Sequence, residues 1–466
     1  MILLGTSNIQ IFYTNDLHSH LEQWPKIISL LNEKRKFHEE QGDNVLIFDI
    51  GDHADRFHPL TEATMGKANV ELMNEVGYDG ATIGNNEGIT ISKQALSTLY
   101  NKANFPVLVA NLFNLSGDRP KWVKPYHLIK LSNELTIGVI GLTIPFRPFY
   151  NALGWSIEDP FEILPPLVKE VKEQADIVIF LSHLGLNFDE EVANQIDGID
   201  VILGGHTHHV LENGMVINNT IIHQAGKFGR YVGQLSLSFD NNEHQISSYN
   251  AQCLVVDSYN PCTVTVETIK RISHTQQAVL DEEIISIEQP LTISWEKPSP
   301  FADLLATAIK EWCDGEIGMI NSGLILDELL EGPVTKGDLH RVCPHPINPC
   351  KVELNGSLLK EIIHHALSEE MIHKKIRGFG FRGKVMGIMV FDGVTYEEKK
   401  LTDGLSHVYN IKVNGEKIQH DRVYQVATLD MFTFGHLFPT IATAKVKQYY
   451  MPELLRDLLA WKLKKM

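Results

Sequence analysis

The stretch Val201-Ile202-Leu203-Gly204-Gly205-His206-Thr207-His208 decides the fold of the first half of the chain. Three branched apolar residues are typical of a buried strand, and two glycines and two histidines follow soon after them. In α/β proteins, ligands bind beyond the carboxyl ends of the strands. The stretch therefore predicts a strand whose end carries functional imidazoles, and its glycines let the backbone come close to what the imidazoles bind.

Further segments place a polar side chain where a predicted strand or a short apolar run ends. They are Tyr13-Thr14-Asn15-Asp16-Leu17-His18, Asp49-Ile50-Gly51-Asp52, Ile83-Gly84-Asn85-Asn86-Glu87 and Leu181-Ser182-His183. One Asp-X-His pattern alone is weak, because it arises by chance. Together, these strand ends indicate one shared site beyond the carboxyl ends of the strands.

The residue types at these ends predict a transition-metal site. Mixed imidazole nitrogen and carboxylate oxygen ligands suit Zn, Mn, Fe, Co or Ni, and they do not suit an all-oxygen calcium site. One carboxylate shared by two metals holds them about 4 Å apart, the spacing of two-metal hydrolases. Such a pair makes a hydroxide nucleophilic at neutral pH and stabilises phosphoryl oxygens, so phosphoester hydrolysis is the expected reaction.

The surrounding sequence predicts stacked α/β layers with buried sheets, because strand-like and helix-like segments alternate. The strand-like runs besides Val201–Leu203 are Ile9–Tyr13, Val45–Ile50, Val107–Ala110, Thr136–Gly141, Ile177–Leu181, Val216–His223 and Tyr231–Phe239. The helix-length segments are Trp24–Glu40, Thr61–Val76 and Phe161–Glu173.

The chain is long enough for two domains, since its 466 residues exceed the roughly 250–300 at which a single core stops growing. We predict a catalytic domain over residues 1–262, a connecting helix over 263–285 and a second domain over 286–466. In the second half we expect helices over Phe301–Trp312 and Ser357–Leu367, strands over Ile317–Ile320 and Cys350–Leu354, and a tight turn at Asn355-Gly356.

Composition excludes several classes of function. The net charge of −17 argues against a nucleic-acid-binding surface, which would be basic. No run approaches the about 20 apolar residues that span a bilayer, so no membrane partner is expected. The N-terminus lacks the basic and apolar regions of a secretory signal, and five scattered cysteines suit reduced thiols. We therefore expect a cytoplasmic protein that acts on a small molecule.

The strand-end motifs resemble the calcineurin-like metallophosphoesterase superfamily, and the whole chain resembles its 5′-nucleotidase family. In the second half, the resemblance is carried by Pro298–Ala306, Asn321-Ser322-Gly323, Gly332–Thr335, Val352–Gly356 and Tyr424–Thr428. The resemblance implies a four-layer αββα metallophosphoesterase sandwich followed by a smaller α/β substrate-binding domain.

The same resemblance implies which residues hold two divalent transition metal ions, Mn, Zn, Fe or Co. One metal would take Asp16, His18, Asp52 and His208, and the other would take Asp52, Asn85, His183 and His206. Asp52 is thus the bridging ligand and counts among the catalytic residues. A water held between the metals would attack phosphorus.

Two positions depart from the family pattern. The family has Gly-Asn-His-Glu followed by an aspartate, and this His–Asp pair acts near the leaving group; here the positions are Asn86 and Ile89. In one interpretation a neighbouring residue supplies the lost charge, with His53, His58 and His209 as candidates. In the other, no general acid is needed because the leaving group is already stable, as in a phosphoanhydride. Asn86 would in both cases help to orient the phosphate.

The substrate domain departs as well. Family members place an arginine just after Asn-Gly-Gly to hold the substrate, and Leu326 stands there in this chain. Val385 and Met431 fall near the positions of the aromatic residues that enclose the base. The candidates for substrate contacts are Asn86, Asn321, Phe379, Phe381, Arg382 and Met431.

The leading interpretation is a two-metal hydrolase of a small phosphorylated metabolite, derived from a nucleotide and acting in nucleotide breakdown. One alternative is a nucleotide pyrophosphatase or cyclic-nucleotide phosphodiesterase on the same scaffold. Another is a nucleotide-binding sensor that has lost catalysis. The missing pair at Asn86 and Ile89 favours the sensor, whereas the intact set of metal ligands disfavours it.

Overall fold

A computed structural model describes residues 5–400 and 406–466 of the protein. The chain divides into two compact units, Met1–Gln276 and Gln277–Met466. The division falls inside helix α9 (Thr263–Leu280), which begins where the connecting helix is predicted and ends before residue 285.

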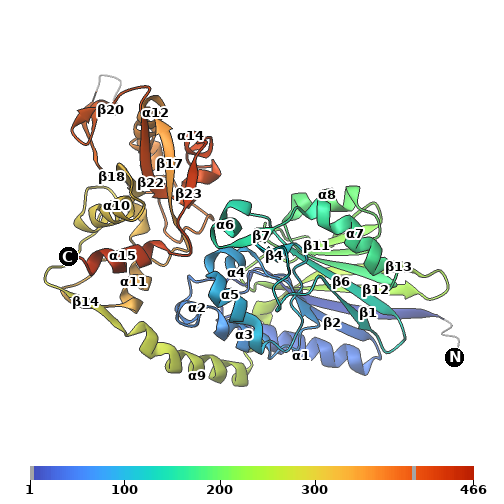
Figure 1. Ribbon diagram of the computed structural model, residues 1–466. Coiled ribbons are helices and arrows are strands. Elements are labelled where there is room, and N and C mark those ends of the chain that lie inside the picture. The colour runs from blue at the N-terminus through green and yellow to red at the C-terminus, as the bar shows by residue number, and fades with distance from the viewer. Residues whose placement is uncertain (1–4, 401–405) are drawn as a thin grey trace. The chain divides into compact units, whose positions relative to one another are not determined.

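Two sheets form the centre of the first unit (Figure 1). One runs in the order β13-β12-β1-β2-β3, with β1 (Thr6–Thr14), β2 (Asn44–Asp49), β3 (Gly80–Ala81), β12 (Tyr231–Asp240) and β13 (Gln245–Val255). The other runs in the order β10-β11-β9-β8-β6-β5, with β5 (Tyr126–Lys130), β6 (Thr136–Thr143), β8 (Ile177–His183), β9 (Val201–Gly204), β10 (Met215–Ile217) and β11 (Thr220–Gln224). A small separate pair consists of β4 (Leu112–Asn114) and β7 (Trp155–Ile157).

Parallel pairing brings the ends of the functional strands together. Strands β1 and β2 are parallel neighbours, and so are β8 and β9. The carboxyl ends of each pair therefore lie at the same edge of its sheet, where α/β proteins bind ligands. The two sheets pack face to face, because one apolar cluster combines Ile11 and Phe48 of the first sheet with Leu181 and Leu203 of the second.

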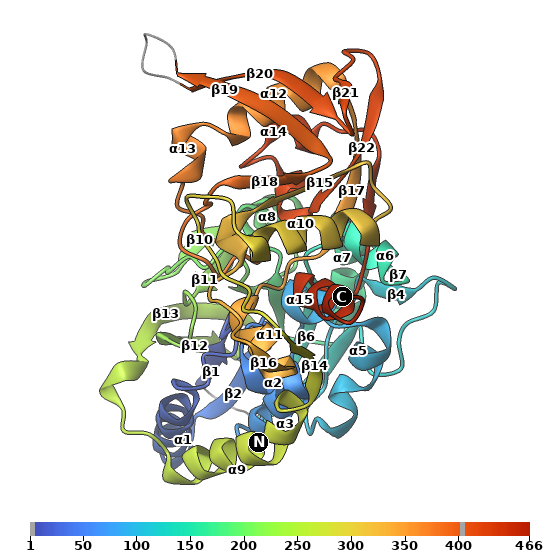
Figure 2. The ribbon, with the colours of Figure 1, turned by 90° about the vertical axis from the view of Figure 1, so that its left-hand side faces the viewer.

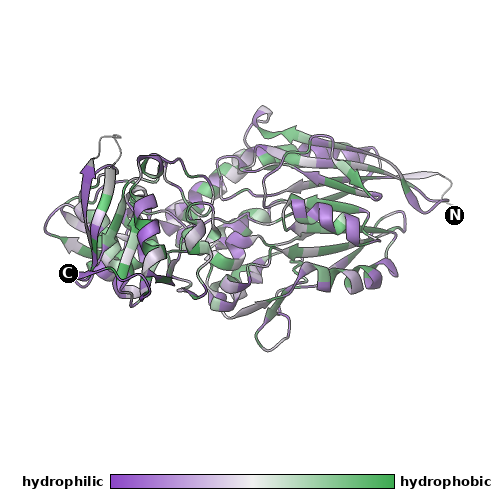
Figure 3. Ribbon diagram, turned by 90° about the horizontal axis from the view of Figure 1, so that it is seen from above, coloured by the Kyte–Doolittle hydropathy of each residue, from purple (hydrophilic) through white to green (hydrophobic). Residues whose placement is uncertain are grey.

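Helices cover the outer faces of the two sheets, with α1 against β2 and α7 against β6, and complete four layers. Apolar residues are frequent along the strands (Figure 3). Phe12 points away from the inner cluster and contacts His38 of α1, with ring centroids 5.9 Å apart, whereas its neighbours Ile11 and Tyr13 face inward. This alternation is the two-residue period of a strand. On the other side, α7 packs against β6 and β8, and α8 packs against β9 and β11, through a cluster that includes Leu164.

The helices of the first unit connect the strands. They are α1 (Trp24–Glu40), α2 (Pro59–Thr64), α3 (Lys67–Met73), α4 (Asn85–Thr90), α5 (Lys93–Leu99), α6 (Arg147–Ala152), α7 (Pro160–Lys172) and α8 (Leu186–Gln195), with 3-10 turns η1 (Tyr100–Lys102) and η2 (Val256–Ser258). The predicted helix over Thr61–Val76 is wrong in one respect, because the structure breaks it between α2 and α3. Met65 and Gly66 there have left-handed backbones, with φ of 48° and 81°, which end an α-helix.

Two predicted strands are also corrected. The segment 107–110 forms isolated bridges with Ala81 and Lys124 and no continuous strand. The segment 216–223 is a hairpin of β10 and β11 that turns at Asn218 and Asn219. Both asparagines have positive φ, 46° and 69°, the two-residue turn geometry that matches the twist of the flanking strands.

The second unit is built on a sheet in the order β18-β15-β22-β17-β23, with α10 on one side and α12 on the other (Figure 2). Its strands are β15 (Ile317–Asn321), β17 (Pro349–Asn355), β18 (Met389–Asp392), β22 (Val423–Leu429) and β23 (Lys447–Tyr449). Smaller sheets are formed by β14 (Glu283–Ile287) with β16 (Gly332–Thr335), and by β19 (Val394–Lys400), β20 (Ser406–Val413) and β21 (Glu416–Lys417). The helices are α10 (Pro300–Trp312), α11 (Lys336–Val342), α12 (Gly356–Ala366), α13 (Glu369–Ile372), α14 (Pro439–Ala442) and α15 (Leu455–Leu463), with 3-10 turns η3 (Ser322–Leu324) and η4 (Asp430–Phe434).

The predicted turn at Asn355-Gly356 is instead the start of α12. The side-chain oxygen of Asn355 accepts a hydrogen bond of 2.9 Å from the backbone N–H of Leu358, so Asn355 is the N-cap. This bond satisfies one of the N–H groups that the first turn of a helix leaves without a partner.

Replacing Asn355 by Ala should lower the free energy of unfolding by about 1 kcal/mol, because the first turn of α12 loses its cap. Urea denaturation followed by circular dichroism measures this loss. Asn355→Ser retains a capping oxygen and should stay close to the wild type. An equal loss in both variants would show that the cap is not the cause.

Candidate metal centre

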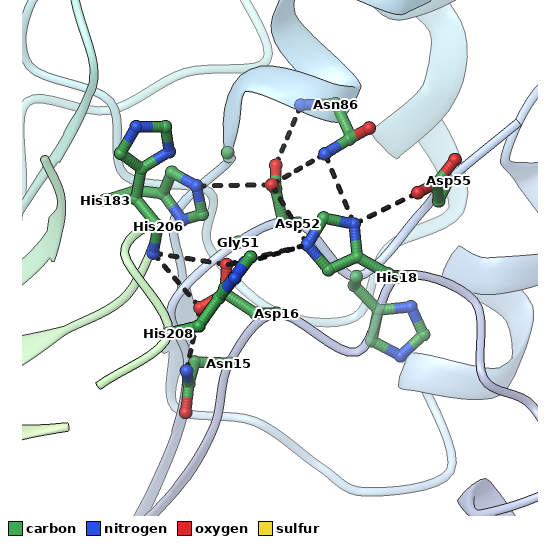
Figure 4. Close-up of polar contacts among 12 residues, drawn as sticks. Asn15, Asp16, His18, Gly51, Asp52, Asp55, Asn86, His183, His206 and His208 are labelled. Carbon is green, nitrogen blue, oxygen red and sulfur yellow. Dashed lines mark hydrogen bonds and ion pairs between the residues drawn. The ribbon is translucent and has the colours of Figure 1, made fainter. Parts of the chain in front are cut away.

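The side chains predicted to bind metal come from the carboxyl ends of the strands and the first turn of α4 (Figure 4). Asp16 and His18 follow β1, Asp52 follows β2, His183 ends β8, His206 and His208 follow β9, and Asn85 begins α4. The backbone of this first turn touches the cluster, because the N–H of Asn86 donates to Asp52 Oδ1 over 2.8 Å.

Donor atoms of five of the predicted ligands converge in two overlapping groups. Asp16, His18 and His208 form one, and Asp16, Asp52 and His183 form the other, with the facing atoms of each group within 4.8 Å of one another. His208 Nε2 lies 3.3 Å from Asp16 Oδ1, and His183 Nε2 lies 3.5 Å from Asp52 Oδ2. His18 Nε2 lies 3.6 Å from Asp52 Oδ2, which links the two groups.

Several of these residues have a strained backbone. The left-handed φ values are 48° for Asp16, 46° for His18, 51° for Asp52, 70° for His206 and 61° for His208. Such a conformation costs roughly 1–3 kcal/mol for a residue other than glycine, and it clusters at functional sites. Hydrogen bonds between the loop after β1 and the loop after β2 hold this backbone conformation in place. The N–H of Asp16 donates to the carbonyl of Gly51 over 3.0 Å, and the N–H of His18 donates to the carbonyl of Asp52 over 2.8 Å.

Asp16 is oriented by neighbours on both sides. The side chain of Asn15 donates to its Oδ2 over 2.8 Å, and the backbone N–H of His206 lies 3.1 Å from both carboxylate oxygens. At Gly205 a Cβ would come within 2.9 Å of Asp16 Oδ2, so only glycine permits this approach without a shift. Asn15 was not singled out from the sequence, although it stands next to a predicted ligand.

Two of the predicted metal ligands have a buried atom without a hydrogen-bond partner among the described residues, namely Asn85 Oδ1 and His183 Nε2. The other ring nitrogen of His183 donates to the carbonyl of Ile50 over 2.7 Å, so in the neutral ring it is Nε2 that carries the lone pair. Buried polar atoms normally have partners. An amide oxygen, an imidazole nitrogen and two carboxylates are donors that fit a divalent transition metal.

Burial and charge set the protonation of the site. Burial would raise the pKa of Asp52, but the charge of His183 outweighs it and lowers that pKa well below its usual range. Burial lowers the pKa of His206 to about 4, so this imidazole is neutral at pH 7. Burial, aided by the charge of Asp52, raises the pKa of Glu87 to about 7. Metals bind carboxylates and neutral imidazoles, so Asp52 and His206 have the required forms.

Glu87 is a residue whose role the sequence did not reveal. Its carboxylate accepts from the backbone N–H groups of Asp52 over 3.1 Å, Ala54 over 2.7 Å and Gly84 over 2.9 Å. It therefore ties the loop of Asp52 to the first turn of α4. Glu87 follows Gly84 by three residues, which is the spacing of a helix-capping glutamate, and this spacing is the sequence signal for its role.

The predicted catalytic residues Asn86 and His53 have different surroundings. The Asn86 amide donates to Asp52 Oδ2 over 2.6 Å, so it lies within the site. His53 packs edge-on against Trp24, with ring centroids 4.7 Å apart, and burial lowers its pKa to about 3. His53 is therefore uncharged at pH 7, and any part it has in catalysis is that of a neutral group.

In the second unit, the predicted substrate contacts fall into two groups. Asn321, Phe381 and Met431 are buried, the last at 1% exposure, so their side chains offer little surface to a ligand. Phe379 is half-buried and shares an aromatic cluster with Phe434 and His436, at centroid distances of 5.8 and 5.0 Å. Arg382 is half-buried in the same loop as Phe379.

Comparisons with known proteins agree with this geometry. Residues 9–210 match the model of the calcineurin-like phosphoesterases, and residues 276–442 match that of the 5′-nucleotidase C-terminal domain. An uncharacterized metallophosphoesterase of Bacillus subtilis (strain 168), YunD, is 48% identical over 98% of this chain and 99% of its own length. The chain belongs to the 5′-nucleotidase family of calcineurin-like metallophosphoesterases. As a member of this family, it is a metal-dependent phosphoesterase.

More distant matches confirm the predicted two-domain α/β fold of this metallophosphoesterase. The 5′-nucleotidase of Rattus norvegicus is 25% identical, over 77% of this chain and 71% of its own. The solved structure of the NAD nucleotidase of Haemophilus influenzae superposes with a TM-score of 0.69 at 17% identity, and covers 99% of this chain and 97% of that one. Among the described residues, we find no helix with the length and apolar character needed to cross a bilayer.

Asp52→Asn should weaken metal binding at least about 100-fold. Even the loss of a residue that only hydrogen-bonds to a metal ligand lowers metal affinity about 10–100-fold. The substitution keeps the shape of the side chain and removes its charge. Isothermal titration of metal-stripped protein with Mn²⁺ measures the affinity. Asp240→Asn, which alters an exposed turn of the same unit, serves as the control. Wild-type binding by Asp52→Asn would exclude Asp52 as a ligand.

Gly84→Ala should destabilise the protein by about 1–3 kcal/mol, the usual cost of overpacking, because the added Cβ would collide with the Asp52 carboxylate. The midpoint of urea denaturation measures the loss. At Gly80 an added Cβ would be 3.4 Å from Leu108 Cδ1, an ordinary contact, so Gly80→Ala is the matched control. Equal stability of the two variants would contradict the close approach at Gly84.

Proposed function

We propose that this metallophosphoesterase hydrolyses a small phosphorylated metabolite with two divalent transition metal ions, Mn, Zn, Fe or Co. The observation that carries the proposal is the pair of adjoining donor groups, which share Asp16 and include Asp52. The partnerless buried atoms of Asn85 and His183 support it, because a bound cation would satisfy them. Two adjoining groups provide for two ions rather than one.

When bound, such ions supply Lewis-acid stabilisation of the phosphoryl oxygens and activate water. The chain's own contribution is to hold the ligands before substrate arrives. Asp16 and Asp52 bring negative charge, and the braced loops fix their carboxylates. This rigidity matters because a misplacement of about 1 Å in an active site can cost 10²-fold in rate.

Asn86 shapes the choice of leaving group. An amide cannot release a proton at neutral pH, and the Asn86 side chain and backbone both donate to the Asp52 carboxylate. Ile89, at the second position of the family's pair, is apolar. General acid catalysis is worth about 10²–10⁴-fold, and its loss affects poor leaving groups most. We therefore propose a preference for phosphoanhydrides, whose leaving group is a stabilised phosphate.

The aromatic cluster of the second unit supports a nucleotide-derived substrate. Phe379 has a left-handed backbone, with φ of 54°, which is unusual for an aromatic residue, and it lies beside Phe434 and His436. The same loop carries Arg377 and Arg382. A base that stacks on an aromatic side chain gains about 1–3 kcal/mol, and arginines pair with phosphates.

The cytoplasmic location stays part of the proposal. All five cysteines of the chain are free thiols in the structure, which suits a reducing compartment.

We expect the metal-loaded protein to hydrolyse nucleoside diphosphates or dinucleotides faster than AMP or a cyclic nucleotide. The double variant Asn86→His/Ile89→Asp restores the family's pair and should raise the rate on AMP by about 10²-fold or more, with little effect on anhydrides. Phosphate release with each substrate, in parallel and with added Mn²⁺ or Co²⁺, measures the preference.

The matched control is Asn86→His alone, which adds the imidazole without its carboxylate partner. If wild-type protein hydrolyses AMP far faster than anhydrides, the preference is wrong. If it binds nucleotides and metals without any turnover, the proposed hydrolase gives way to a sensor.

A further inference from the structure

His18 and His183, one from each donor group, are held by different kinds of acceptor. The Nδ1 atom of His18 lies 3.1 Å from Asp55 Oδ2, and that of His183 lies 2.7 Å from the carbonyl oxygen of Ile50. Both contacts turn Nε2 of the ring toward the carboxylates of the site. One acceptor is a carboxylate and the other is a neutral carbonyl.

Asp55 is fixed in place independently of His18. It is 1% exposed, and its Oδ1 accepts from the backbone N–H of Phe57 over 2.9 Å. Its own N–H donates to the hydroxyl of Ser19 over 2.8 Å, and that hydroxyl lies 2.8 Å from Thr61 Oγ1. A buried carboxylate held by separate bonds can dictate the orientation of its partner ring.

The contacts around His18 also fix the position of its proton. A carboxylate can only accept, so His18 Nδ1 donates to Asp55. The Asn86 amide nitrogen lies 3.4 Å from the same atom, but its shorter bond, 2.6 Å, is to Asp52 Oδ2. In the neutral ring, His18 Nε2 then carries the lone pair, and it faces Asp16, Asp52 and His208.

We infer that Asp55 is a positioning residue that makes the donor group of Asp16, His18 and His208 bind its cation more tightly than the group of His183. A hydrogen bond to a carboxylate is stronger than one to a carbonyl, and it makes the imidazole a better electron donor to a metal. Asp55 also adds a negative charge behind only one of the two groups. The inference rests on the proposed two-metal function.

Metal-stripped, full-length wild type titrated with Mn²⁺ should bind two ions with clearly unequal affinities. In Asp55→Asn, the tighter step should weaken about 10–100-fold while the weaker step stays unchanged. Asp79→Asn is the matched control, since this carboxylate of the first unit accepts from the backbone N–H of Ile47 over 2.7 Å and should not alter either step.

A second readout needs no metal and does not depend on Asp55→Asn. Long-range ¹H–¹⁵N spectra of histidine-labelled, metal-stripped wild type report the His18 tautomer, with the signal assigned by its loss in His18→Gln. In the neutral ring a proton on Nδ1 is expected, and a neutral ring with its proton on Nε2 would overturn the inference even if Asp55→Asn did not fold.

The outcomes separate the two proposals. If the wild type binds only one ion, the two-metal function and this inference both fail. If it binds two ions of equal affinity, or if Asp55→Asn leaves the tighter step unchanged, this inference alone fails.

Discussion

The close approach of two buried carboxylates is the constraint on which the rest of the site depends. Asp16 and Asp52 are 0% and 2% exposed, and their oxygens share one donor group. Like charges in a poorly hydrated place repel each other and lose solvation, so they are tolerated only where positive charge is at hand. Burial would lower the pKa of His183, yet the charge of Asp52 outweighs it and raises that pKa to about 10.

The same imidazole must lose its proton before it can ligate a metal. Protons and metal ions are therefore alternative sources of the positive charge that the carboxylates demand. The scaffold cannot relieve the repulsion by letting the carboxylates swing apart. Asn15 and the backbone of His206 hold Asp16, and the first turn of α4 holds Asp52.

The sequence predicted the parts of the site that depend on strand ends. Apolar runs mark the strands, and parallel order brings their carboxyl ends together, so Asp16, Asp52 and His183 could be grouped without coordinates. Asp55 could not, because its importance depends on the loop after β1 turning back to meet the loop after β2, as in the bond from Ser19 N–H to the carbonyl of His53. No local pattern records such a contact.

Other differences between the predictions and the structure also arise from tertiary contacts. Met431 stands at a position where the family has an aromatic residue, but packing places it in the core of the second unit. Asn355 and the pair Asn218-Asn219 all signal a change of direction. Only the following hydrogen bonds decide that the first begins a helix and the pair turns a hairpin.

The left-handed backbone of the ligand loops restricts how this site can evolve. Asparagine, aspartate and histidine are the residues other than glycine that enter this conformation most readily, and the predicted metal ligands found there are aspartates and histidines. Aspartate and histidine thus suit both metal coordination and the left-handed backbone. Replacement of Asp16 or Asp52 by glutamate would keep the charge yet oppose the backbone. Lineages that change metal or reaction are therefore steered toward exchanges among these few residue types at the left-handed positions.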